Sequence, residues 1–465
     1  MHSHWRGSQE WRKLGMPLTT GSEEACRLYD AIVTQYAGWY DDESVGGMDG
    51  TLQKLAAADP DFVMGQVVTN GLEALSTGRS IRLDPSFKAA IERMVEQARD
   101  TNVTQREKKH VEAVKLFAEG DIKSATICWE DILLDHPTDI LATKFAHDSY
   151  FYMGASIEIR DSIGRVLPHW KPDMPLYGYL LGMHAFGLEE TNLYSEAEAS
   201  ARKALNINPR DAWSTHALCH VMEMTGRQQD GINMMTDTDQ FWTTCGMLAC
   251  HNYWHWALYH IEIGDYESAL SIFDEQVTVR ARNSQQMLDI VDVSSLLFRL
   301  QMEGVNIGNR WDSVYDYCKT HLHDHLLVFN DLHILLSCLG SGHKESAQEL
   351  MDSIQTFVKE GQGHNKDVTA DVGQALCQAF VAYDDGDFAS AVELLLPIRY
   401  KVITIGGSHA QRDLVNLFLI QAAIKSPEKK HHKLARSLLN ERKVWKPNAP
   451  MTDRLMAKAI EAHAS

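Results

Sequence analysis

Five side chains able to carry a proton or bind a metal ion fall on two short segments. His216, His220 and Glu223 are spaced i, i+4 and i+7, so they share one face of a helix, and His251 and His255 repeat the i, i+4 spacing. Two imidazoles one turn apart can chelate zinc or another borderline metal, with a further histidine or a carboxylate completing the site. Neither pair has the H-E-x-x-H order that supplies a metalloprotease base.

Three interpretations of this cluster stay open. His216, His220, His251 and His255 hold a divalent metal, or the cluster with Glu223 forms a metal-free pocket that binds a ligand or works by general acid–base chemistry. In the third, which we favour, the histidines pack between helices as hydrogen-bonded buried groups.

Four further positions are candidate ligand contacts. Trp254 is a stacking wall for a ligand or a core residue, and Asp148, beside His147, is part of a dyad or of a surface pair. We favour the core role for Trp254 and the surface pair for Asp148. His409 and Arg412 follow a Gly-Gly-Ser segment whose serine is a plausible N-cap, so the helix start suits an anion. The alternative, which we favour, is that Arg412 pins the terminal repeat.

Signatures of other chemistries are missing from the sequence. There is no Walker A motif, no dinucleotide fingerprint and no G-x-S-x-G elbow. The His-rich run at 321–325 is typical of a solvated helix end.

The elements that position these residues follow a repeat. A Gly-Asp pair, an alanine four residues after the Asp and a bulky residue four positions further on recur at 120–129, 264–273 and 386–395, and a related copy starts at Tyr194. A glycine that tolerates positive φ followed by an N-capping Asp ends one helix and opens the next. The spacing of about 34 residues is that of tetratricopeptide repeats. The sequence therefore predicts an all-α superhelix of stacked antiparallel helix pairs.

The predicted organisation has three parts. Residues 1–103 are an irregular leader (1–20) and a helical cap, 104–280 carry the clearest repeats, and 281–465 carry degenerate repeats and a second cap. Helices are expected at 22–36, 63–75, 86–99, 104–118 and 287–303, and helix pairs at 328–358, 371–399 and 411–442, the last pair closing before Pro447. The first helix of each pair lines the concave groove of such an array, so the four histidines and Glu223 are expected to converge there.

Composition limits the function classes. The 465 residues carry a net charge of −19, which argues against nucleic acid or an anionic membrane as the main ligand, because both attract a basic surface. Eight scattered cysteines without a C-x2-C pair fit a reduced compartment, and the N-terminus lacks an apolar signal region. We expect a cytoplasmic protein.

Three segments are more specific than the repeats. The run Ala249–Leu258, the His216-x3-His220-Val-x-Glu223-Met motif and Gly406–Asp413 together resemble the tetratricopeptide repeat protein 38 family over nearly the full chain. The resemblance implies a soluble helical-repeat protein and does not imply a particular biochemical activity. We expect a scaffold whose groove binds a protein segment or a small ligand; the alternative is an enzyme that uses the His/Glu cluster, with or without a divalent metal. Homo-oligomerisation through the helical faces is a third option.

Overall fold

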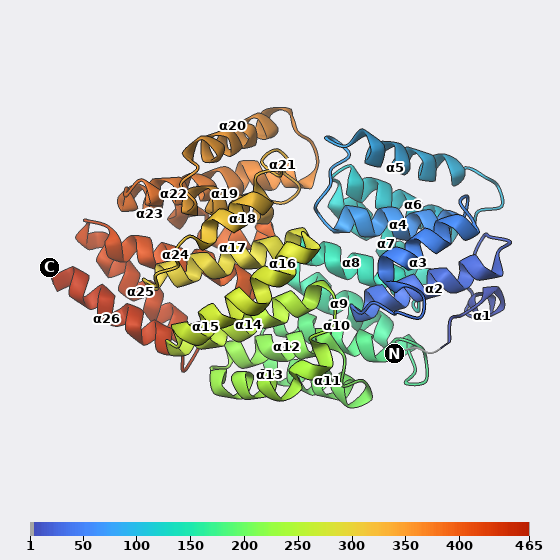
Figure 1. Cartoon of the computed structure of the whole chain (residues 1–465), viewed down its shortest axis with the longest axis horizontal. Coiled ribbons are helices and arrows are strands. Elements are labelled where there is room, and N and C mark those ends of the chain that lie inside the picture. Colours follow the sequence, from blue (N-terminus) through green and yellow to red (C-terminus); the bar gives the residue numbers. More distant parts are fainter. Residues whose placement is uncertain (1–3, 465) are drawn as a thin grey trace. The chain divides into compact units, whose positions relative to one another are not determined.

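The computed structural model describes residues 4–464, and every regular element in that range is a helix (Figure 1). Within each unit, helices that follow one another in the chain pack together as antiparallel pairs, and successive pairs stack. The predicted fold class, an all-α array of tetratricopeptide-like helix pairs, is confirmed. The first three residues of the predicted leader and Ser465 lie outside the described residues.

The described residues form two compact units. The first unit comprises the chain up to Ala217 together with Phe241–Leu248, and the second comprises Leu218–Gln240 and the chain from Ala249 onward. The three-part division made from the sequence stays a prediction.

The first unit is built from eleven helices and a short 3-10 turn. They are α1 (Ser8–Lys13), α2 (Glu23–Gly38), α3 (Gly47–Ala58), α4 (Val63–Leu75), α5 (Pro85–Gln97), α6 (Gln105–Ala118), α7 (Ile122–Asp135), α8 (Ile140–Met153), α9 (Ser156–Val166), η1 (Leu167–His169), α10 (Tyr177–Glu189) and α11 (Tyr194–Ile207). Three helices then contain a boundary between the units: α12 (Ala212–Met224), α13 (Gln228–Trp242) and α14 (Met247–Ile263).

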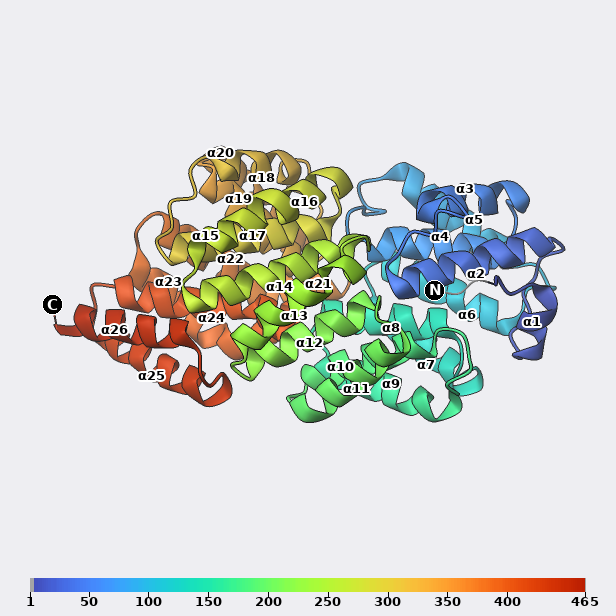
Figure 2. The same cartoon turned by 60° about the horizontal axis from the view of Figure 1, so that its bottom comes forward.

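The second unit continues to the C-terminus. Its remaining elements are α15 (Tyr266–Ile272), η2 (Phe273–Val277), α16 (Thr278–Ser284), α17 (Met287–Met302), α18 (Arg310–Cys318), α19 (Val328–Gly340), α20 (Lys344–Glu360), α21 (His364–Val368), η3 (Thr369–Gly373), α22 (Gln374–Asp384), α23 (Phe388–Leu395), η4 (Leu396–Ile405), α24 (His409–Lys425), α25 (Lys429–Trp445) and α26 (Pro450–Ala464). Helix α17 packs against α19 and α24, and α19 packs against α22, which Figure 2 shows from a second side.

The Gly-Asp turns have the predicted geometry. Gly120, Gly264 and Gly386 adopt φ values of +88°, +84° and +83°, a region that glycine enters without a Cβ clash. Each following Asp side chain accepts the backbone N–H three residues on, at 3.0 to 3.2 Å, and so caps the next helix. The alanine of each of these repeats is fully buried.

Both ends of the chain carry a helix that the sequence analysis did not predict. Part of the leader forms α1, because Trp11 is 2% exposed and packs on the Tyr29 ring. After Pro447 the chain opens a further helix at Pro450, a residue whose fixed φ suits the first turn. The predicted last pair at 411–442 is present as α24 and α25 and ends before Pro447, but the chain continues into this further helix.

Among residues 4–464, no helix combines the length and the apolar character that crossing a membrane requires.

Candidate metal centre

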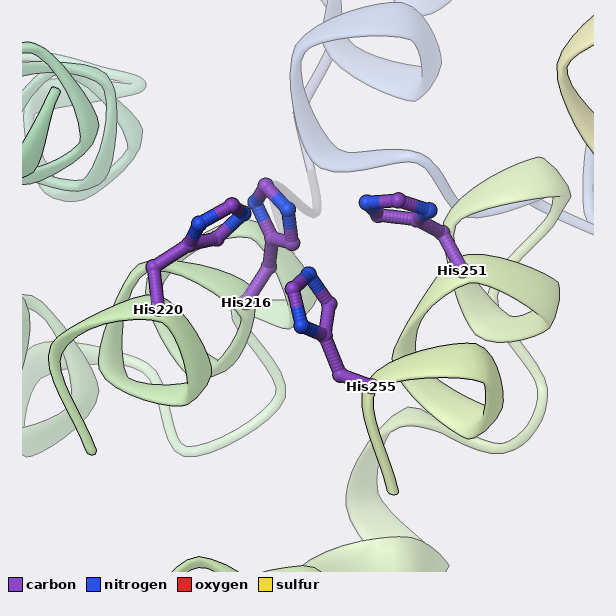
Figure 3. Close-up of side chains that lie close together, drawn as sticks. All are labelled: His216, His220, His251 and His255. Atoms are coloured by element: carbon purple, nitrogen blue, oxygen red, sulfur yellow. The ribbon is translucent and has the colours of Figure 1, made fainter. Parts of the chain in front are cut away.

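Helices α12 and α14 bring the predicted histidines together. One ring nitrogen from each of His220, His251 and His255 lies within 4.8 Å of the others, and His216, one turn before His220 on the same helix, offers a further nitrogen within the same distance (Figure 3). The ring centroids of His220 and His255 are 4.4 Å apart, and those of His251 and His255 are 4.8 Å apart. The i, i+4 spacing therefore produces the expected convergence.

The cluster is buried. His220 and His255 are 0% exposed, and the His251 side chain keeps 15% of its surface. Burial lowers the pKa of His220 well below its ordinary value, with the neighbouring cationic groups adding to the effect. Burial also lowers the pKa of His255 to about 4, outweighing the opposing hydrogen bond with Glu223. Both rings are therefore neutral at pH 7, which is the form that binds metals.

Two carboxylates orient the α14 histidines. Asp292 Oδ2, on α17, accepts the Nδ1–H of His251 at 2.8 Å. Glu223 Oε2, on α12, lies 3.5 Å from Nδ1 of His255. A carboxylate beside Nδ1 holds the ring proton there and makes Nε2 the acceptor nitrogen, the arrangement that metal-binding histidines use. Glu223 was predicted as a groove contact, whereas Asp292 was not predicted.

A buried ion network supports Glu223. Lys446 Nζ, at the end of α25, lies 3.0 Å from Glu223 Oε1 and 3.4 Å from Glu262 Oε2. Burial alone would raise the pKa of Glu223, but Lys446 and His255 hold it well below its usual range. Glu223 is therefore ionised, and Lys446 contacts one of its oxygens while His255 lies beside the other.

Trp254 lies against the cluster. Its indole is 0% exposed and stacks on the His251 ring at 5.1 Å and 12°, and the Arg299 guanidinium lies 5.5 Å from the indole centroid. Arg299 in turn donates to the backbone oxygen of Ala410 at 2.6 Å, which ties α17 to the start of α24. Trp254 thus packs the wall behind His251.

The Gly-Gly-Ser segment caps α24 as expected. The Ser408 hydroxyl accepts the Gln411 N–H at 3.2 Å, and Gln411 Oε1 accepts the Ser408 N–H at 2.9 Å. Arg412 donates to the backbone oxygen of Gly407, and Asp413 binds the Arg442 guanidinium through both of its oxygens. These contacts favour the structural role of this segment. His409 is half-buried, and its positive form and Arg412 both lower the pKa of His220.

Asp148 lies in the first unit, on α8. Lys144 Nζ donates to its two oxygens at 2.5 and 2.6 Å, and the Tyr36 hydroxyl also donates to it. The adjacent His147 is 0% exposed, so the expectation of a surface pair was wrong. The apolar and aromatic residues of α8 bury both faces of this helix.

The sequence analysis missed two supporting residues, and only one of them has a recognisable signal in the sequence. Asp292 is a charged residue among the apolar residues of α17, as Asp289 and Arg299 are, and that contrast is a usable signal for buried charges with partners. Lys446 reaches Glu223 across 223 positions of sequence, and no local pattern marks it.

The comparisons with known proteins concern the helical architecture. No family model matches the chain. A chain of the APC/C Cut9–Hcn1 hetero-tetramer is similar with a TM-score of 0.40 and 11% identity, over 94% of this chain and 83% of that chain. Human IFIT1 as a dimer with m7Gppp-AAAA is similar with a TM-score of 0.36 and 12% identity, over 98% of this chain and 93% of that chain. Human IFIT1 with PPP-AAAA gives 0.27 and 11%, over 85% of this chain and 100% of that chain.

Proposed function

We propose that this helical-repeat protein is a metalloprotein that binds one divalent transition-metal ion at His220, His251 and His255. The observation that carries the proposal is the convergence of three imidazoles, two of them fully buried, with Asp292 bonded to Nδ1 of His251 and Glu223 lying 3.5 Å from Nδ1 of His255. Histidine ligands in proteins are oriented in this way by carboxylates outside the metal's own coordination shell.

The donor set selects the metal class. Imidazole nitrogens suit zinc, copper, iron and nickel, whereas magnesium and calcium prefer oxygen ligands. Tetrahedral ligands at about 2.0–2.1 Å from zinc stand about 3.3 Å from one another. The ring nitrogens already lie within 4.8 Å, so small ring rotations are sufficient to close the site.

The number of imidazoles decides what the metal can do. Three protein ligands leave a position for water or a substrate, as in catalytic zinc sites, whereas four close the shell, as in structural sites. His216 supplies the fourth imidazole from one turn before His220 on α12. An open position supports the enzyme alternative, in which the metal activates a bound water.

The wider role stays a proposal. We infer from the three segments that carry the resemblance that the chain is related to the tetratricopeptide repeat protein 38 family. Binding of a protein segment or small ligand in a groove remains the expectation of the sequence analysis.

The test is elemental analysis of the purified, chelator-washed protein, followed by calorimetric titration with Zn²⁺ and Co²⁺. We expect one ion per chain in the wild type and loss of that binding in His220→Ala and His255→Ala. His260→Ala is the matched control, because His260 lies on the same helix, bonds the carboxylate of Asp265 at 3.0 Å and is not part of the cluster. A folded wild type that takes up no more metal than the two cluster variants would falsify the proposal.

A further inference from the structure

A second set of side chains in the second unit has the geometry of a catalytic triad. His325 Nε2 lies 2.7 Å from the Ser353 hydroxyl, and His325 Nδ1 lies 3.2 Å from both oxygens of Asp331. In a catalytic triad, a carboxylate holds the Nδ1–H of an imidazole whose Nε2 accepts the proton of a serine hydroxyl. This arrangement makes the serine a nucleophile.

The surrounding structure fixes the imidazole. His325 lies in the loop between α18 and α19, with φ of +46°, a left-handed conformation that few residues other than glycine adopt. The Asn365 side chain donates to the His325 carbonyl at 2.6 Å, and the Phe357 ring lies 5.1 Å from the imidazole at 29°. His325 is 3% exposed and Asp331 is 1% exposed, so the base and its orienting acid are held in place.

Ser353 is the least buried of the three residues. It lies in the middle of α20 and keeps part of its surface exposed, whereas His325 and Asp331 are buried. The expectation that the 321–325 run is a solvated helix end was wrong for His325.

A second histidine approaches the same hydroxyl. His323 Nδ1 lies 2.9 Å from Ser353 Oγ, and its Nε2 lies 2.9 Å from Glu349 Oε1. A hydroxyl has one proton, which it donates to His325 Nε2 when Asp331 holds the other ring proton. His323 is then a second group in contact with the nucleophile oxygen, and Glu349 orients it.

We propose that Ser353, His325 and Asp331 form a nucleophilic site that hydrolyses small uncharged carboxylic esters. Ser353 Oγ bonds to the ester carbonyl carbon while its proton passes to His325 Nε2. The bond from that carbon to the alkoxy oxygen then breaks, and the alkoxy group takes the proton and leaves as the alcohol. Water attacks the acyl-serine, gives its proton to Nε2, and releases the acid as that proton returns to Oγ. Asp331 positions the imidazole by holding its Nδ1–H.

The experiment is labelling of the full-length protein with a fluorophosphonate, with the modified serines identified by peptide mass spectrometry, together with hydrolysis of p-nitrophenyl acetate. Ser346 is an internal control, because it lies seven residues earlier on the same face of α20, is also half-buried, and its hydroxyl bonds the Tyr315 hydroxyl at 2.8 Å instead of a histidine. We expect labelling at Ser353 and none at Ser346. Ser353→Ala should abolish labelling and ester turnover, and Ser346→Ala should leave both unchanged.

Substitutions of the histidines separate catalysis from packing. Removal of a general base typically costs about 10²- to 10⁴-fold in rate, so His325→Gln should slow Ser353 labelling by at least that lower factor. His323→Gln, on an exposed residue, should slow it less and leave thermal stability unchanged. Equal labelling of Ser353 and Ser346 in the wild-type protein overturns the proposal without any variant. An unchanged labelling rate in folded His325→Gln overturns it as well.

Discussion

The two units each bury a polar cluster on helices of the repeat array, and the clusters differ in how their charges are balanced. On α8, Lys144 and Asp148 form a closed ion pair, and the ammonium lies 4.6 Å from the ring centroids of both Tyr36 and Trp39. On α12 and α14, neutral imidazoles converge, and the nearby carboxylates bind the outer nitrogens of the rings.

The difference shows what makes a buried cluster a binding site. The α8 pair neutralises itself, so a further ion would only disturb it. Burial lowers the pKa values of His220 and His255, so these rings are neutral and their lone pairs suit a metal cation. Both clusters are buried, so burial of polar groups does not distinguish them. They differ in where their protons point: the Lys144 ammonium points at the Asp148 carboxylate within the pair, whereas the Nδ1–H of His251 points at Asp292, outside the histidine cluster.

The largest expected effect is on the histidine side of the comparison. The double variant His220→Ala, His255→Ala removes two of the proposed ligands and should abolish stoichiometric metal uptake, measured by plasma mass spectrometry after dialysis. Asp148→Asn, on the other side, should retain one ion per chain. Equal metal content in the two proteins would remove the distinction between the clusters.

The next effect is on stability. Asp148→Asn leaves the Lys144 ammonium buried without its carboxylate, and breaking a buried pair from one side costs about 3–5 kcal/mol. Urea unfolding should show that loss. Lys144→Met combined with Asp148→Leu should recover most of it, because the apolar pair leaves no buried charge. If the double variant is as unstable as Asp148→Asn, the ion pair contributes net stability and does not merely neutralise its own buried charges.

The third effect is a pH dependence of the metal-free protein. The pKa of His255 in the folded protein is about 4, below the value of about 6.5 expected when unfolded, so the unfolded state binds the proton first as pH falls. The stabilising contribution is complete above pH 6.5 and is lost towards pH 4, at about 1.4 kcal/mol per pH unit, or about 3 kcal/mol in all.

The difference between wild type and His255→Gln isolates this ring, because the buried His110 and His147 of the first unit titrate in both proteins. Unfolding free energies measured by urea titration from pH 7 to 4 should fall less steeply in His255→Gln. Parallel curves would mean that His255 is not held neutral by burial.

The smallest effect concerns the carboxylate behind His251. Asp292→Asn keeps the shape but weakens the hold on Nδ1–H, and such outer partners are worth about 10- to 100-fold in metal affinity. Asp289→Asn is the matched control, since Asp289 is equally buried on α17 but bonds Ser284. Competitive titration with a chelating dye measures both. The same loss in the two variants would point to a general effect of charge on α17.

The sequence predicted the parts of the molecule that local spacing determines. The Gly-Asp turns, the buried alanines and the convergence of His216, His220, His251 and His255 all follow from periods of one helical turn or one repeat. Helix α26 and the burial of α8 depend on packing between elements distant in sequence, and the local pattern does not contain that information.

The chemistry of the second unit shows the same limit. Ser353 and His325 are 28 residues apart and Asp331 lies on another helix, so the three carry no motif such as G-x-S-x-G. Lys446 and Asp292 likewise act on the histidine cluster only through tertiary contacts.

The most direct test of the metal centre is X-ray absorption spectroscopy at the edge of the metal that the wild-type protein binds. The account predicts a shell of three or four imidazole nitrogens at about 2.0–2.1 Å, with the outer-ring scattering of histidine. A shell of oxygen ligands only, or a spectrum that His220→Ala leaves unchanged, would contradict it.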